Sequence, residues 1–187
     1  MKLATKETPE HIVGIDIGSS KVTALIAGER DDELSLLGFG VAENTGMRRG
    51  SIINLEATTQ AISHAVEEAE LMAGVGIESA YLGVGGGHIK GINSRGSINL
   101  PDDNPRISKD DVDRVIGAAR AVAIPSDREV IHLLPQEFTV DDDRGIEDPV
   151  GFSGRRLEVG VHLVTAYETS VQNVVTCAQN AGLAVHD

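Results

Sequence analysis

The sequence predicts an α/β protein in which a β-β-β-α-β unit is followed by a smaller α+β unit. Two apolar runs within residues 11–27 are joined by the short link Gly18-Ser19-Ser20-Lys21, a pattern typical of a β-hairpin. Apolar residues at helical spacing then recur over about 54–73. The pattern changes at the three glycines 85–87, where a second unit begins.

Three meandering strands and one helix form most of the predicted first unit. After the hairpin, residues 33–43 are expected to form a third strand, and their glycines indicate a bulge. Asn54 is placed to cap a helix that ends near Ala73 and is stopped by Gly74. The apolar stripe expected on this helix consists of Ile62, Ala65, Val66, Ala69 and Met72. A buried strand over 79–84 completes the order.

The second unit is predicted from one helix and several strands. Residues 108–111 resemble a capping box, and the helix that follows them ends before Pro125. Strands are expected, with a proline between the first two, at 129–134, 137–140 and 157–165. A final helix over about 167–181 is stopped by Gly182, with an inward face made of Val171, Val174, Val175 and Ala178.

Composition excludes several classes of function. The 187 residues carry a formal net charge of −13, and such a surface repels phosphate backbones, so we expect no nucleic-acid partner. No apolar run reaches the length of a membrane span, and the first ten residues lack the apolar stretch of a signal peptide. The sequence therefore predicts a cytoplasmic protein. Cys177 is the only cysteine, and its place on an apolar helical face indicates packing.

Common catalytic and metal motifs are missing. The run Gly83-Val-Gly-Gly-Gly87 does not fit the dinucleotide fingerprint, so we interpret it as a flexible crossing between the two units. His64 and Glu68 share a helix face, but two ligands make no metal site, and a solvated pair is expected. The acidic run Asp141 to Asp143 lacks the spacing of a calcium loop and is expected to be a solvated loop.

The hairpin carries the one chemical signal of interest. A carboxylate near the end of an apolar strand costs desolvation energy unless it meets a cation or hydrogen-bond donors, and Asp16 is such a carboxylate. The backbone N–H groups of Gly18, Ser19, Ser20 and Lys21 are placed to converge on a phosphate, with Asp16 holding a hydrated magnesium ion beside it. The alternative is an ordinary hairpin with a partly solvated acid.

The order of motifs supports a resemblance to a known family. The segment Asp16-Ile-Gly-Ser-Ser-Lys21 resembles the first phosphate motif of the actin-like ATPase superfamily, which sugar kinases and the heat-shock chaperone family share. Further segments resemble the FtsA family of bacterial cell-division proteins from about residue 11 onward. They are Gly46-Met-Arg-Arg-Gly-Ser-Ile-Ile-Asn-Leu-Glu56, Ala80-Tyr-Leu-Gly-Val-Gly-Gly-Gly87, Arg106-Ile-Ser108, Ile131-His-Leu-Leu-Pro-Gln-Glu-Phe138 and Val161-His-Leu-Val-Thr165.

This resemblance implies a fold and a site. Residues 11–83 with 166–187 would form an incomplete actin-like (ribonuclease-H-like) first subdomain, and 84–165 an inserted small α+β interaction subdomain. Gly18, Ser19, Ser20 and Lys21 would contact the terminal phosphates of ATP, and Asp16 would serve magnesium through water. ATP and magnesium would be the cofactors of the complete protein, with neither bound tightly by this chain.

The resemblance also implies partners and a location. An FtsA-type protein self-associates, links the FtsZ ring to the membrane and recruits later division proteins at the inner face of the cell membrane. Membrane attachment would come from a C-terminal anchor that this sequence lacks. The second phosphate motif and the adenosine-binding glycines are also missing, so the chain corresponds to the N-terminal part of the family and is expected to have no activity alone.

Three alternatives stay open at this point. The first is a pilus-assembly or shape-determining actin homologue of the same superfamily. The second is a lobe of a carbohydrate kinase, which would need an acidic general base in a cleft between two lobes. The third is a pure interaction module with a vestigial hairpin.

Overall fold

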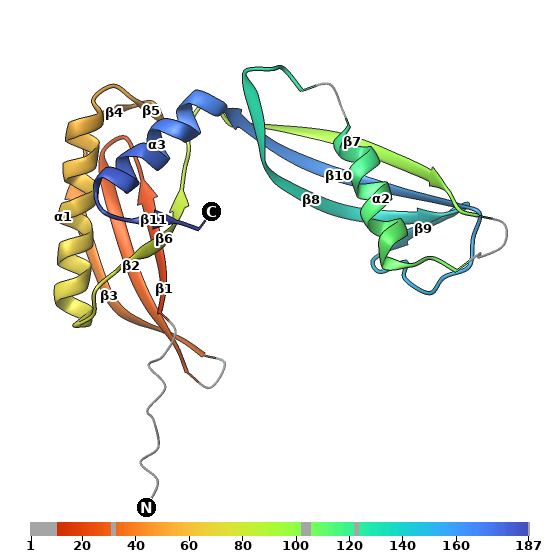
Figure 1. The fold of residues 1–187 in the computed structure, drawn as a ribbon, viewed down its shortest axis with the longest axis horizontal. Coiled ribbons are helices and arrows are strands. Elements are labelled where there is room, and N and C mark those ends of the chain that lie inside the picture. Colours follow the sequence, from red (N-terminus) through yellow and green to blue (C-terminus); the bar gives the residue numbers. More distant parts are fainter. Residues whose placement is uncertain (1–10, 31–32, 102–105, 122–123, 187) are drawn as a thin grey trace, which may run out of the picture. The chain divides into compact units, whose positions relative to one another are not determined.

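The computed structural model describes residues 11–30, 33–101, 106–121 and 124–186, and these form two compact units. The first unit contains the residues up to His88 together with those from Thr169 onward, and the second contains Ile89–Glu168. The boundaries predicted from the sequence, 83/84 and 165/166, lie a few residues before those of the structure. Figure 1 shows the elements of each unit, which are described separately below.

A five-stranded sheet with the order β11-β6-β1-β2-β3 forms the first unit. Its strands are β1 (His11–Ile17), β2 (Lys21–Arg30), β3 (Glu33–Glu43), β6 (Ser79–Gly83) and β11 (Ala184–Val185). The pairs β1/β2 and β2/β3 are antiparallel, whereas β6 runs parallel to both β1 and β11. The predicted hairpin, third strand and later strand are confirmed. A short antiparallel pair, β4 (Met47–Arg48) and β5 (Ser51–Ile52), lies between β3 and the first helix in the sequence.

Two helices cover one face of this sheet, α1 (Leu55–Ala73) and α3 (Glu168–Asn180). Asn54 caps α1 through a hydrogen bond that its side chain accepts from Ala57, and Gly74 ends it with a φ of 71°, both as predicted. The predicted stripe is buried except for Met72, which lies in the last turn of the helix and is 54% exposed. The shared core includes Val13, Ile15, Ile17, Val22, Ala24, Ile26, Ile62, Ala65, Val174 and Cys177.

Two glycines of β3 let the backbone of α1 come unusually close. A Cβ on Gly40 would overlap the Ala65 carbonyl oxygen and lie 2.8 Å from the Ala69 nitrogen. A Cβ on Gly38 would lie 2.9 Å from the Ala73 nitrogen. The β2/β3 register also shifts beside Gly38, so the predicted bulge is confirmed there. The main role of these glycines is nevertheless the close approach of helix and strand.

The opposite face of the same sheet is apolar and exposed. Its large side chains are all at least 38% accessible and comprise Ile12, Leu25, Leu34, Leu36, Phe39, Val41 and Tyr81. In the sheet register Tyr81, Gly14, Leu25 and Phe39 form one row across four strands. The next row contains Gly83, Asp16, Thr23 and Val41, so the carboxylate of the hairpin lies on this open face.

The second unit is a four-stranded antiparallel sheet with the order β7-β10-β8-β9 and one helix packed on it. Its elements are β7 (Lys90–Asn99), α2 (Lys109–Arg120), β8 (Arg128–Val140), β9 (Asp143–Ile146) and β10 (Arg156–Tyr167). β7 is continuous although it contains Gly91 and Gly96. Its Gly96 lies directly under α2, where a Cβ would be 2.5 Å from the Ala119 nitrogen.

One strand of the second unit differs from the prediction. The segments 129–134 and 137–140 belong to a single strand, β8, which runs through Pro135. The register against β10 shifts between Gly160 and Val161, opposite Glu137 and Pro135, and this irregularity accommodates a residue that has no N–H to donate. The acidic segment after β8, expected to be a loop, contains the short strand β9.

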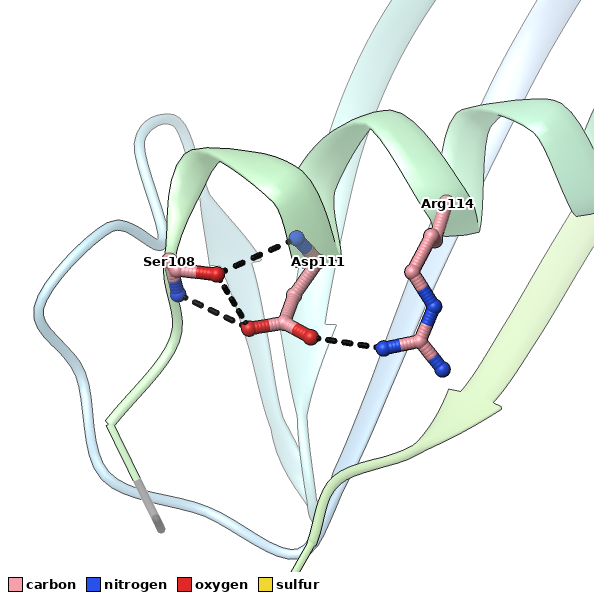
Figure 2. A network of polar contacts seen from close by, with 3 residues as sticks. All are labelled: Ser108, Asp111 and Arg114. Atoms are coloured by element: carbon pink, nitrogen blue, oxygen red, sulfur yellow. Dashed lines mark hydrogen bonds and ion pairs between the residues drawn. The ribbon is translucent and has the colours of Figure 1, made fainter.

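The helix of the second unit begins with the predicted capping box, which Figure 2 shows. The Ser108 hydroxyl donates to Asp111 Oδ2 at 2.6 Å, and the Ser108 N–H donates to the same oxygen at 3.0 Å. The Asp111 N–H in turn donates to Ser108 Oγ at 3.3 Å. Arg114 binds the other carboxylate oxygen at 2.8 Å. The Ser108 hydrogen bonds, followed by Arg114, lower the pKa of Asp111.

The close helix–strand contact makes Gly40→Ala a sharp test of the fold. Because the added methyl group would overlap backbone atoms of α1, we expect a loss of roughly 2–3 kcal/mol in the free energy of unfolding. Gly14→Ala is the matched control, since a Cβ there meets nothing within 4 Å. Urea unfolding of both variants decides the matter, and equal stabilities would contradict the close packing of α1 on β3.

The capping box predicts a pH-dependent stability. Asp111→Ala should lower the stability of the second unit by about 1 kcal/mol at neutral pH, whereas Asp113→Ala, an exposed position of the same helix, should change it little. Because the pKa of Asp111 is depressed in the folded state, its contribution is present above the unfolded value of about 3.9 and is lost as the pH falls through the folded value. Thermal unfolding between neutral and acidic pH should show the two variants converging.

Candidate functional site

Asp16 lies at the exposed end of β1, between two glycines. It is paired with Thr23 across the hairpin and with Gly83 of the parallel strand β6. A Cβ on Gly83 would lie 3.4 Å from Asp16 Oδ1, and one on Gly18 would lie 3.9 Å from Oδ2. The carboxylate is therefore flanked by bare backbone and open to solvent, so it pays little of the desolvation cost that a buried strand position implies.

The tip of the hairpin uses one of its four amides internally. Gly18 N–H donates to the Lys21 carbonyl oxygen at 2.9 Å, so this amide is not free to bind an anion. Gly18 takes part in the candidate site through its missing side chain, which leaves room beside Asp16. Ser19, Ser20 and Lys21 carry the amides that remain candidates for a phosphate, and all three residues are exposed.

A buried asparagine supports the tip from behind. Asn44, which follows β3 and is only 3% exposed, donates from its backbone N–H to the Ser20 carbonyl oxygen at 3.0 Å. Its Nδ2 donates to the Gly18 carbonyl oxygen at 2.9 Å. Its Oδ1 accepts from Gly46 N–H at 3.0 Å and from Thr58 Oγ1 at 3.4 Å. Asn44 thus joins the hairpin to the start of α1.

The glycine crossing is packed against the hairpin region and is not a loose linker. Gly50, with a φ of 79°, donates its N–H to Ser19 Oγ at 2.9 Å. A Cβ on Gly50 would overlap the Gly85 carbonyl oxygen, and one on Gly86 would lie 2.8 Å from the Gly50 Cα. The segment expected to be a flexible crossing thus contacts Gly50, where two backbones meet with no side chain between them.

Sequence reasoning missed the residues that come from outside the hairpin. Asn44, Gly50 and Gly83 approach it from three separate segments, and their contacts depend on the tertiary fold. A usable signal was present for Asn44, because an asparagine at the end of a strand favours local hydrogen bonds to backbone such as the one from Gly46 N–H, two residues further on. Gly83 was singled out only as part of the crossing.

The other candidate residues have structural roles. Glu68 Oε2 accepts from Val41 N–H at 2.8 Å and so binds the edge of β3, while His64 and Glu68 are both exposed, as expected. Asp141, whose φ is 53°, accepts through Oδ1 from the N–H groups of Arg155 and Arg156, and these bonds lower its pKa. Cys177 is buried, and burial raises the pKa of its thiol, in agreement with packing.

The described residues contain neither a metal-ligand cluster nor a membrane-spanning helix. Within these residues, no three acidic, histidine or cysteine side chains lie close enough together to hold a metal ion. Among the helices that the structure describes, none has the length and apolar character needed to cross a bilayer.

Comparison with known proteins identifies the fold first. Residues 86–165 match the family described as the SHS2 domain inserted in FtsA. A chain of the solved PilM-PilN type IV pilus biogenesis complex superposes with a TM-score of 0.60 over 96% of this chain and 47% of that chain, at 15% identity, and at that identity the likeness shows the fold alone. The fold is that of an actin-like subdomain with an inserted domain, as predicted.

The similar curated proteins are cell-division proteins. Cell division protein FtsA of Pseudomonas aeruginosa is 41% identical over 99% of this chain and 44% of that protein. FtsA of Borreliella burgdorferi is 41% identical over 94% of this chain and 43% of that protein, and FtsA of Escherichia coli is 35% identical over 93% and 41%. The chain is thus similar to FtsA proteins over nearly its whole length, and it spans less than half the length of these relatives.

The glycine contact beside the hairpin can be tested by Gly50→Ala. This change adds both a strained φ, which costs about 1–2 kcal/mol for a residue with a side chain, and an overlap with the Gly85 backbone. Gly74→Ala has a similar φ of 71° with nothing within 4 Å, so it carries the strain alone. We expect Gly50→Ala to be clearly less stable in equilibrium unfolding. Equal losses would mean that the overlap is relieved without cost.

Proposed function

We propose that this chain supplies one phosphate-binding half of an ATP–magnesium site to an actin-like cell-division scaffold. The observation that carries the proposal is the hairpin, in which an exposed carboxylate lies between two glycines and the tip residues Ser19, Ser20 and Lys21 are all exposed. Asp16 would hold magnesium through water, and the Lys21 ammonium would add a positive charge beside the phosphates.

Similarity to FtsA proteins supports the role in cell division that we propose for the complete protein. The sequence relatives are named cell-division proteins, which favours this class over the pilus-assembly, shape-determining and kinase alternatives. We propose that the complete protein self-associates, links FtsZ to the inner face of the membrane at the division site and recruits later division proteins. In this scheme the part described here provides the hairpin and the inserted domain, and membrane attachment comes from elsewhere in the longer polypeptide.

The hairpin proposal is tested by titrating the 15N-labelled chain with ATP and magnesium. We expect the amide signals of the hairpin tip to move at millimolar ligand, and calorimetry to find no sub-micromolar dissociation constant, because one phosphate clamp without an adenosine pocket binds weakly. Asp16→Ala should remove the magnesium dependence of the shifts, while Asp113→Ala, an exposed acid of the second unit, should keep it. A magnesium-dependent response that survives Asp16→Ala would refute the role of Asp16.

The inserted domain should fold without the rest of the chain. It has its own core, which includes Leu100, Ile107, Val115, Phe138, Leu157, Val159, Val161 and Leu163. β10 pairs with β8 as far as Tyr167 and Arg128, and the Arg128 guanidinium lies 4.8 Å from the Tyr167 ring centre. A segment of residues 84–165 lacks Tyr167 and so loses this contact. A segment of residues 89–168 should therefore melt at a higher temperature.

The melting curves of the 89–168 and 84–165 segments can be measured by circular dichroism. If the 89–168 segment does not unfold cooperatively, the second unit depends on the first unit for its fold. The interaction role that we propose for the inserted domain can be followed in the same segment. If the inserted domain mediates self-association, the sedimentation coefficient of the 89–168 segment should rise with concentration. A segment that stays monomeric at all concentrations would contradict this role of the inserted domain.

A further inference from the structure

Asn44 is the buried polar group whose hydrogen bonds bear most directly on the hairpin. It uses its backbone N–H, its Nδ2 and its Oδ1, and every partner is a backbone atom or the Thr58 hydroxyl. A buried amide left without partners costs free energy, so its orientation is well determined by these bonds. Asn44 approaches the tip from the β3 side of β2 and binds two carbonyl oxygens there. Its side-chain Nδ2 donates to the Gly18 carbonyl, and its backbone N–H donates to the Ser20 carbonyl.

Holding these carbonyl groups fixes the direction of the next amides. In a trans peptide the C=O and the N–H that follows point in opposite directions, and the peptide bonds of this segment are trans. The Gly18 carbonyl shares its peptide plane with Ser19 N–H, and the Ser20 carbonyl shares its plane with Lys21 N–H. Both carbonyls point toward Asn44, so both N–H groups point away from it. The Ser19 and Lys21 N–H groups of the tip therefore point in the same general direction, away from Asn44.

We propose that Asn44 is the positioning residue of this hairpin, turning the Ser19 and Lys21 amides toward a bound phosphate without touching the ligand itself. The inference rests on the phosphate-binding function proposed above. It follows that loss of the Nδ2 donor, with the rest of the side chain kept, releases the Gly18–Ser19 peptide and misdirects one ligand-binding amide. The ligand class is the terminal phosphate of a nucleotide, which accepts hydrogen bonds from such amides.

Asn44→Asp tests this inference most directly. The carboxylate keeps an oxygen for Gly46 N–H but replaces the donor that faces the Gly18 carbonyl by a second acceptor. Since one charge-assisted hydrogen bond is lost, we expect the ATP–magnesium affinity of the chain to fall about tenfold or more. The free variant should also show moved amide signals for Ser19, whereas Gly18, held by Lys21, should change less.

Glu70→Ala is the matched control for a merely structural effect. It removes another side-chain hydrogen bond to backbone in the same unit, the one that Glu70 Oε1 accepts from Ile77 N–H at 2.6 Å, at the opposite end of α1. We expect it to lower the melting temperature and to leave the nucleotide response unchanged. If Glu70→Ala and Asn44→Asp weaken binding equally, or if Asn44→Asp binds as the unaltered chain does, the positioning role is overturned.

Hydrogen exchange of the unaltered chain keeps the inference testable if Asn44→Asp does not fold. Ser19 and Lys21 amides should exchange fast in the free chain and slow down with ATP–magnesium, while Gly18 should be protected in both states. Protected Ser19 and Lys21 amides in the free chain would overturn the inference, because those groups would already have internal partners. If the tip of the unaltered chain does not respond to ATP–magnesium at all, the proposed function fails first and the inference fails with it.

Discussion

The direct contact between the backbones of α1 and β3 is the constraint on which the first unit depends. It exists only because Gly38 and Gly40 have no side chains, so the helix lies against the strand itself. That closeness brings the start of α1 to the end of β3, where Asn44 meets Thr58 and Gly46 meets the Asn54 carbonyl oxygen.

The geometry of the hairpin follows from the same contact. Asn44 can reach the Gly18 carbonyl only from the position that the paired β2 and β3 give it, and α1 closes that position on the other side. A further pair of glycines, Gly50 and Gly86, repeats the device beside Ser19. The exposed site therefore depends on three places where backbones touch because a side chain is missing. They are Gly38 with Gly40 against α1, Gly46 against Asn54, and Gly50 against Gly86.

The parts that the sequence predicted well depend on local chemistry. Asn54, Gly74 and the Ser108–Asp111 box mark helix ends through bonds to neighbouring backbone, and such signals lie within a few residues. The apolar periodicity likewise predicted the hairpin, the strands and most of the α1 stripe. Pro135 misled the prediction because proline normally interrupts a strand, and only the pairing with β10 shows that an irregular register accommodates it.

Only some of the residues of the candidate site could be predicted from the sequence. Asp16 and the tip residues are adjacent in sequence, so their pattern is visible, but Asn44, Gly50 and Gly83 come to the hairpin through sheet order and helix packing. A glycine in a sequence does not say which backbone it will meet, and for that reason the run at 83–87 was interpreted as flexible when Gly85 and Gly86 are packed.

The bond between Glu68 and the Val41 N–H has a consequence for how this protein meets other chains. β3 is the outermost strand of its sheet, and outermost strands carry unpaired backbone groups that can recruit a strand from a neighbour. Here a carboxylate of α1 already occupies one of those donors at 2.8 Å. A strand that tried to extend the sheet at this point would have to displace an ionic partner and would bring its own carbonyl groups toward a negative charge. The helix that builds the core thus also limits uncontrolled aggregation along the sheet border.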